Sequence, residues 1–266
     1  MPVPNVAIMG DGGLTDGDVE RFRQDGAVRL DGAFPRELAD ECRHLLWTAT
    51  GCAEDDPSTW TQPVIRVEAR SDAPFRAAAN TPRLHAAFDR LAGAGRWVPR
   101  AGLGTFPIRF PSAEPPGDDG WHAEATGVNE SGALVVDPAS RERVLLLLFL
   151  FSDVGPDDAP TRIRLGSHLD AARVLCAAPK PPGFFAVAGE LERATRGRPE
   201  GSATGSAGDV WLCHPYLVHA AQPHRGTRVR FMAQPPLAGA GPIDPHRADR
   251  SPVEEAVHRA LHADAS

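Results

Sequence analysis

Apolar residues in the first hundred positions recur at the spacing of helices. The clearest example covers residues 35–51, whose apolar face consists of Leu38, Cys42, Leu45 and Leu46. A shorter helix is expected over 14–26, because Thr15 and Asp18 have the spacing of a reciprocal N-terminal cap. A third helix is expected to begin at Thr81. The N-terminal part is therefore predicted to be mainly helical.

Short apolar and alternating runs replace this pattern after about residue 101. They predict strands over 103–110, 121–128, 143–151, 161–165, 208–214 and 227–234, with an earlier strand at 27–30. The run 143–151 is apolar almost throughout, which is typical of a strand buried on both faces. Residues 52–65 and 111–120 have the composition of loops. Further helices are expected over 168–177 and 184–195, and a final, peripheral helix over 253–262.

Helices followed by many short strands predict a mainly β fold, a barrel or sandwich backed by N-terminal helices. The 26 glycines and 26 prolines agree with the many turns that such a fold needs. We expect one domain over residues 1–266, although two domains remain an alternative at this length. Its parts would be a loose leader at 1–13, helical support at 14–100, a barrel core at 101–236 and a peripheral tail at 237–266.

Composition narrows the range of functions. A net charge of −7 argues against general binding to nucleic acid or to an acidic membrane. No apolar run reaches the roughly 20 residues of a membrane-spanning helix, and residues 1–13 do not have the pattern of a secretory signal. Four cysteines without CxxC spacing suggest reduced thiols. We therefore expect a cytoplasmic protein.

Three His-x-acid triplets could supply metal ligands, because residues i and i+2 of a strand point to the same side. They begin at His122, His168 and His262. His262 lies in the expected C-terminal helix, where such residues diverge, and is interpreted as a surface histidine. His168 follows a strand in Gly-Ser-His, where Ser167 and Asp170 would cap a helix. His122 precedes the most apolar strand, with Glu124 two residues later.

A second group of residues complements His122 and Glu124. His219 follows a strand and a turn, and Arg228 and Arg230 lie on the next expected strand. Two imidazoles and a carboxylate form the facial triad of non-haem Fe(II) oxygenases. An arginine can hold the distant carboxylate of a dicarboxylate cosubstrate, since its charge is permanent and its geometry bidentate.

These motifs, in this order, resemble the phytanoyl-CoA dioxygenase family of Fe(II)/2-oxoglutarate-dependent oxygenases. The resemblance covers roughly residues 14–236. Its pieces are Gln24–Leu30 with Phe34-Pro35, Gly120–Glu124, Phe149–Val154, Arg164–His168, Gly208–Val210, His219 and Arg230-Phe231. The family implies a double-stranded β-helix, which is a cupin-like jelly roll, with Fe(II) as metal and 2-oxoglutarate as cosubstrate.

Carried over position by position, the resemblance makes His122, Glu124 and His219 the metal ligands and catalytic centre. It places the 2-oxoglutarate arginine at Arg230, although strand alternation alone leaves Arg228 open. The family usually has aspartate at position 124, and often a hydroxyl that helps to hold 2-oxoglutarate at the position of Ala221.

Several other residues lie near the expected site. Thr105, Arg109 and Trp121 would contact cosubstrate or substrate, or else simply line the barrel. His214 and His224 flank His219 and are interpreted as loop or supporting residues rather than ligands.

The expected function is oxidation, by default hydroxylation, of a small-molecule metabolite, with O2 consumed and succinate and CO2 released. Two alternatives remain open from sequence. One is a barrel that binds a small molecule without catalysis, and the other is a cupin-type isomerase or hydrolase, in which Arg230 would have no evident role.

Overall fold

The computed structural model describes residues 13–263. The expected leader, apart from Gly13, and the acidic residue Asp264 of the third triplet lie outside the described residues. No helix within 13–263 combines the length and the apolar character needed to cross a membrane.

The larger sheet is antiparallel and contains the most apolar strand of the chain at its centre. Its order is β1 (Ala27–Leu30), β9 (Val210–Cys213), β6 (Leu145–Leu150) and β11 (Met232–Ala233), with β12 (Pro236–Leu237) also paired to β6. Every residue of β6 is buried. This confirms the prediction that the run is covered on both faces.

Alternate residues of β6 belong to two separate cores. Leu145, Leu147 and Phe149 pack in a large cluster with the helices. Leu146, Leu148 and Leu150 face the other way, into a smaller cluster with residues of the second sheet and of neighbouring strands, including Ile163 and Met232. Because side chains alternate along a strand, one strand can fill both layers.

The second sheet has the order β10 (His219–Ala220), β7 (Arg162–Arg164) and β8 (Glu200–Ser202). Two further antiparallel pairs are β2 (Val64–Val67) with β3 (Phe106–Arg109), and β4 (Gly127–Val128) with β5 (Leu134–Val135). A single antiparallel bridge between Arg109 and Arg230 joins β3 to the segment that leads into β11. These antiparallel sheets, backed by helices, agree with the predicted fold class.

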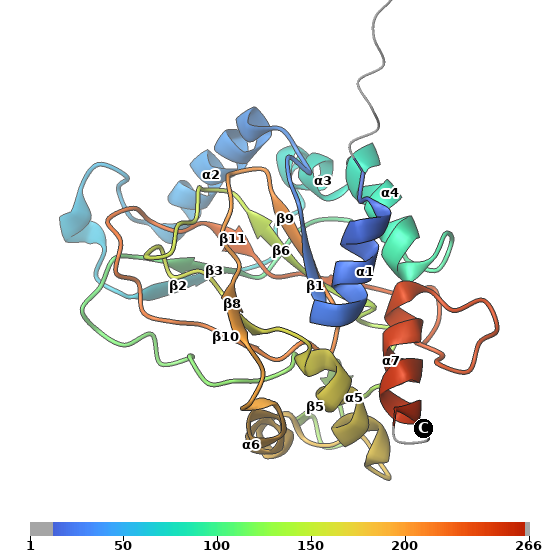
Figure 1. The fold of residues 1–266 in the computed structure, drawn as a ribbon. Coiled ribbons are helices and arrows are strands. Elements are labelled where there is room, and N and C mark those ends of the chain that lie inside the picture. Colours follow the sequence, from blue (N-terminus) through green and yellow to red (C-terminus); the bar gives the residue numbers. More distant parts are fainter. Residues whose placement is uncertain (1–12, 264–266) are drawn as a thin grey trace, which may run out of the picture.

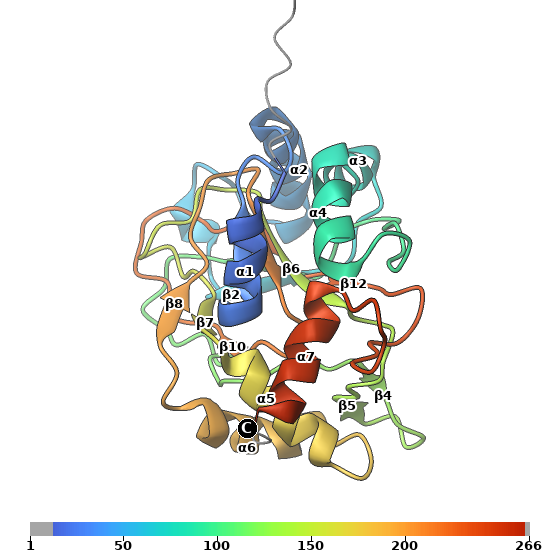
Figure 2. The same cartoon turned by 45° about the vertical axis from the view of Figure 1, so that its right-hand side comes forward.

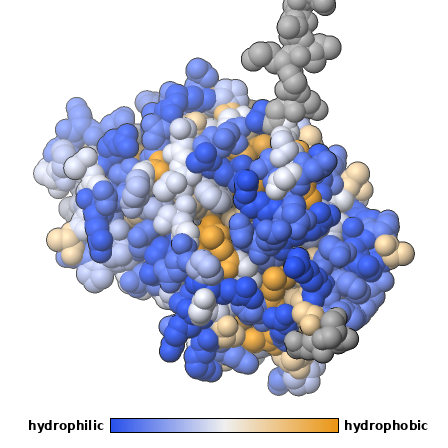
Figure 3. Space-filling model, in the orientation of Figure 1, coloured by the Kyte–Doolittle hydropathy of each residue, from blue (hydrophilic) through white to orange (hydrophobic). Residues whose placement is uncertain are grey.

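Helices α1 to α4 gather along one side of the larger sheet, and α5 and α6 lie at its other end (Figure 1). The α-helices are α1 (Asp16–Asp25), α2 (Arg36–Thr50), α3 (Ala73–Ala79), α4 (Pro82–Ala92), α5 (Ser167–Ala177), α6 (Phe184–Thr195) and α7 (Pro252–His262), and a 3-10 turn covers Pro57–Thr59. The face seen in Figure 1 is mostly hydrophilic, with small hydrophobic areas near its centre (Figure 3).

Local signals place most helix ends correctly. Thr15 and Asp18 form the reciprocal cap of α1, and Gly26 ends that helix at a φ of 79°. Gly51 ends α2 in the same left-handed conformation, with a φ of 72°. Glycine adopts this conformation at little cost, which explains its place at both ends.

The structure differs from the prediction in several stretches. Helix α3 was not foreseen, since seven residues rich in alanine give no clear apolar period. Residues 52–65, expected as a loop, include the 3-10 turn and the start of β2. The strand expected over 121–128 pairs only at His122 and at Gly127–Val128. The pairing does not continue to Glu124. The backbone N–H of Leu217, which would be its partner in register, donates to the carbonyl oxygen of His214 instead.

The prediction that the last helix is peripheral is wrong. Helix α7 packs against α1, α4 and α5 (Figure 2). Four of its residues form a buried stripe at positions i, i+3, i+4 and i+7, namely Val253, Ala256, Val257 and Ala260. This is the stripe of a helix that covers a core.

This packing predicts a stability effect. Val257→Ala removes buried methyl groups and should lower the free energy of unfolding by about 1–3 kcal/mol. His262→Ala, at an exposed position of the same helix, should change it by less than about 0.5 kcal/mol. Denaturant unfolding of both variants measures the difference, and equal effects would mean that α7 contributes little to the core.

Candidate active site

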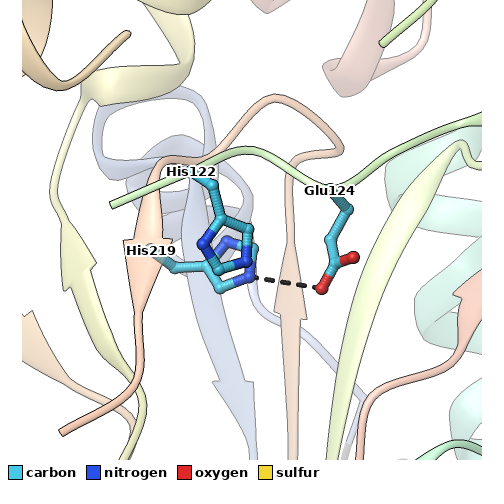
Figure 4. A group of neighbouring side chains, drawn as sticks. All are labelled: His122, Glu124 and His219. Carbon is cyan, nitrogen blue, oxygen red and sulfur yellow. Dashed lines mark ion pairs between the residues drawn. The ribbon is translucent and has the colours of Figure 1, made fainter. Parts of the chain in front are cut away.

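Two backbone segments bring three potential metal ligands together. His122 and His219 form a closed antiparallel pair, with N–O distances of 3.0 and 2.9 Å. Glu124 follows two residues after His122 on the same extended segment, and its carboxylate points to the same side (Figure 4). Ligand atoms of the three side chains all lie within 4.8 Å of one another.

Backbone carbonyls fix both imidazole rings. Nδ1 of His122 lies 2.8 Å from the carbonyl oxygen of Gly120, and Nδ1 of His219 lies 3.0 Å from that of Leu217. A carbonyl only accepts, so each Nδ1 carries a proton, and Nε2 is the atom of each ring that can bind a metal. Burial, together with the neighbouring His219, lowers the pKa of His122 and favours its neutral form. Metal-binding histidines require this state.

Glu124 is ionised in this environment. Burial opposes its charge, but the contact with His219 and the positive charge of Arg143 lower the pKa of Glu124 to about 2. Its Oε1 lies 3.4 Å from Nε2 of His219, and Oε2 lies 3.9 Å from the Arg143 guanidinium.

The donor set therefore fits a cation. Nε2 of His219 is buried without a hydrogen-bond partner and faces a carboxylate oxygen. An ionised carboxylate and a lone pair on Nε2 repel each other at this distance, so the contact needs either a proton on Nε2 or a metal cation between the two atoms. Two imidazole nitrogens and one carboxylate oxygen are the ligands of the facial triad, which leaves further coordination positions open.

The cluster lies in the wall of a cavity of about 490 Å³. Its remaining walls combine arginines, an acid and apolar side chains. The lining consists of Arg66, Arg109, Gly117, Asp118, Gly120, Trp121, His122, Glu124, Thr161, Phe184, Phe185, Ala188, His219, Ala221, Arg230 and Gln234.

Arg230 is buried in this cavity, with 1% of its surface exposed. Its Nη2 donates to the carbonyl oxygen of Pro107 at 3.1 Å, and Nη1 donates to that of Ala159. These bonds hold the guanidinium in place, while Nε has no acceptor. Burial, and the nearby charge of Arg109, lower the pKa of Arg230 well below its usual value. A buried cation without a counter-ion is costly, so the site favours an anion.

Arg228 lies elsewhere. Its side chain is 66% exposed and pairs with Asp158 at 3.2 Å. The expectation that it shares a face with Arg230 assumed a regular strand over 227–234. Only Met232–Ala233 is a strand, and Arg228 lies in a bend. Thr105 is exposed and outside the cavity lining, and only its backbone carbonyl is used, by Gln234.

The other histidines are separate from the cluster. His168 and His214 are buried with ring centroids 4.9 Å apart, and burial lowers the pKa of His168 to about 4. The expected caps of α5 are absent from the structure. Ser167 instead accepts a hydrogen bond from the backbone of Val218, and Asp170 pairs with Arg198.

Thr161 is the cavity residue that sequence reasoning missed most clearly. In the register of β10 and β7, His219 is opposite Ile163 and Ala220 is opposite Arg162. Thr161 and Ala221 each lie one residue beyond this paired stretch, and both line the cavity. The hydroxyl of Thr161 contacts only the sulfur of Met232, at 3.8 Å. A thioether is a weak acceptor, so this hydroxyl is available to a ligand.

Similar structures share this fold. The carbocyclase SnoK from nogalamycin biosynthesis, described as non-haem and α-ketoglutarate-dependent, superposes with a TM-score of 0.58 at 18% identity, over 85% of each chain. HygX from Streptomyces hygroscopicus, with nickel, 2-oxoglutarate and hygromycin B bound, gives 0.54 at 17% identity, over 83% of this chain and 86% of its own. EctD from S. alaskensis gives 0.54 at 18% identity, over 86% and 78%. These matches confirm the jelly-roll fold.

No curated protein sequence matches this chain. The family model for phytanoyl-CoA dioxygenase, in contrast, matches residues 22–232, which include all three residues of the cluster and Arg230. The chain therefore belongs to the phytanoyl-CoA dioxygenase family of Fe(II)/2-oxoglutarate-dependent oxygenases.

Proposed function

We propose that His122, Glu124 and His219 hold Fe(II) and that Arg230 binds the distal carboxylate of 2-oxoglutarate, for the oxidation of a small-molecule metabolite. One observation carries the proposal. The cluster of His122, Glu124 and His219 lines the same cavity as Arg230, a buried arginine whose Nε has no acceptor. A non-catalytic binding barrel has no need of both.

Fe(II) and 2-oxoglutarate, when bound, supply the oxidising chemistry with O2, with succinate and CO2 as by-products and hydroxylation as the default outcome. The protein holds the ligands in place. Carbonyl contacts to Nδ1 of both histidines keep their Nε2 atoms aimed at the metal position, and the low pKa of Glu124 keeps its carboxylate charged. Such fixed groups need no reorganisation during the reaction.

Arg230 orients the cosubstrate and does not itself react. Its two hydrogen bonds to backbone carbonyls fix the guanidinium, so the distal carboxylate of 2-oxoglutarate binds at one defined position. Apolar side chains, including Trp121 and Phe184, form part of the lining and reduce the number of polar groups that hold water there. Water exclusion strengthens the contact between guanidinium and carboxylate.

Thr161 supplies the hydroxyl that Ala221 lacks. Thr161 comes just before β7 and Ala221 just after β10, so a register continued by one residue would bring their Cβ atoms to about 5 Å. Arg230 donates to the carbonyl of Ala159, two residues before Thr161, which brings the guanidinium close to this segment. In this proposal, the hydroxyl comes from the segment before β7 and not from position 221.

Relatives of similar fold suggest the substrate class. HygX was solved with hygromycin B, and the epimerase SnoN with nogalamycin RO. Both are small molecules of natural-product type. A cavity of about 490 Å³ is in the range that accommodates such ligands.

Metal binding gives the first test. His219→Ala should weaken Fe(II) or Ni(II) binding by more than about 100-fold, because even supporting residues of metal ligands contribute about 10–100-fold. His224→Ala, a buried histidine outside the cluster, should bind as the original chain does. Anaerobic titration with metal analysis measures both, and full metal binding by His219→Ala would contradict the ligand assignment.

Cosubstrate binding gives the second test. Arg230→Gln should raise the Kd for 2-oxoglutarate about 10–100-fold, the usual worth of a hydrogen bond between charged groups. Arg228→Gln is the matched control and should leave it unchanged. Succinate formation by the Fe(II)-loaded protein in air is measured alongside. A correctly folded protein that binds neither metal nor 2-oxoglutarate would overturn the proposed function.

The role of Thr161 gives the third test. Thr161→Val preserves the shape of the side chain and should raise the Kd for 2-oxoglutarate about three- to tenfold. Adding Ala221→Ser to this variant should restore part of the affinity, because the hydroxyl returns from the opposite strand. An unchanged Kd in Thr161→Val would show that the hydroxyl does not contact the cosubstrate.

A further inference from the structure

A second buried arginine lines the cavity and has hydrogen-bond donors without an acceptor. Arg109, which is 4% exposed, ends β3. Its Nη2 lies 2.9 Å from both carboxylate oxygens of Asp118. Its Nε and Nη1 are buried and have no acceptor. Unsatisfied donors on a buried charged group are costly, so a ligand that accepts from them gains affinity.

Arg109 and Arg230 are direct cross-strand neighbours. Their backbones exchange hydrogen bonds of 3.1 and 2.9 Å, so both side chains lie on the same face. Burial lowers the pKa of both guanidiniums, and each lies near a like charge. With Arg230 assigned to the distal carboxylate of 2-oxoglutarate, the free donors of Arg109 are open to a second anion.

The charges around the cavity leave positive charge in excess. Three arginines of the lining, Arg66, Arg109 and Arg230, face two carboxylates, Asp118 and Glu124. Glu124 also faces the buried Arg143, which lies 3.9 Å from it. A divalent metal and a dicarboxylate cosubstrate cancel each other, so an anionic ligand would reduce the excess that remains.

Another part of the lining is apolar. The N-terminal end of α6 contributes Phe184, Phe185 and Ala188, and Trp121 also lines the cavity. Phe185 is 83% exposed at the rim, which is unusual for so large an apolar side chain. An apolar body would bury this surface while its charged end reaches inward.

We propose that the substrate is a small carboxylic acid with an apolar body, and that Arg109 binds its carboxylate. The inference rests on the proposed function, because it assigns the second anion of the same cavity. Arg66 does not serve this purpose as well, since its side chain is 56% exposed, whereas Arg109 is buried and has two donors without an acceptor.

The test compares acids with their own uncharged amides. The probes are 3-phenylpropanoate, 4-phenylbutanoate and octanoate, each beside its primary amide, added to protein loaded with Ni(II) and 2-oxoglutarate. For at least one pair the acid should bind about 10-fold or more tightly than the amide. Arg109→Gln should abolish this preference, Arg109→Lys should retain part of it, and Arg228→Gln should leave it intact.

Several outcomes would overturn the inference. One is the absence of any preference for acid over amide in protein that binds metal and 2-oxoglutarate normally; this leaves the proposed function standing. Another is an Arg109→Gln variant that keeps the preference but binds 2-oxoglutarate at least 10-fold more weakly, since Arg109 would then belong to the cosubstrate site. If Arg109→Gln does not fold, Arg109→Lys with its shorter reach provides the same comparison.

Discussion

The closed backbone pair between His122 and His219 is the contact on which the site depends. It joins an irregular segment to the short strand β10, and it fixes two ligands by main-chain bonds rather than by side-chain packing. Glu124 lies on the same side as His122, because it comes two residues later on the same extended segment. A second closed pair, between Arg109 and Arg230, fixes the two buried arginines of the cavity lining by main-chain bonds. Two isolated bridges thus position most of the charged groups in the cavity.

Both pairs are supported by the interior of the barrel. One set of alternate residues of β6 forms the small core with Ile163 and Met232. Ile163 lies in β7, which follows Thr161, and Met232 lies in β11, which follows Arg230. The helices lie on the other face of the same sheet and contribute no lining residue except at the start of α6. The helical part therefore stabilises the sheet, while the chemistry is confined to the strand ends.

Much of this could be predicted from local patterns. Helix caps at Thr15 and Gly26, the doubly buried strand and the order of ligand motifs all depend on residues close in sequence. The predictions were wrong or incomplete where the structure depends on contacts between residues far apart in the sequence. Helix α7 has a clear apolar stripe, but nothing local shows which helices cover it. Arg228 and Arg230 could not be separated because a bend interrupts their strand. Thr161 and Ala221 line the same cavity only through a cross-strand register that the sequence does not contain.

The position of Thr161 also bears on where a missing group should be sought. Along the chain, position 221 is an alanine and offers no hydroxyl. Across the sheet, Thr161 brings a hydroxyl to the lining of the same cavity from the residue just before β7. A group absent from one strand of a sheet can thus be present on its neighbour, so its absence is judged correctly only across the strands.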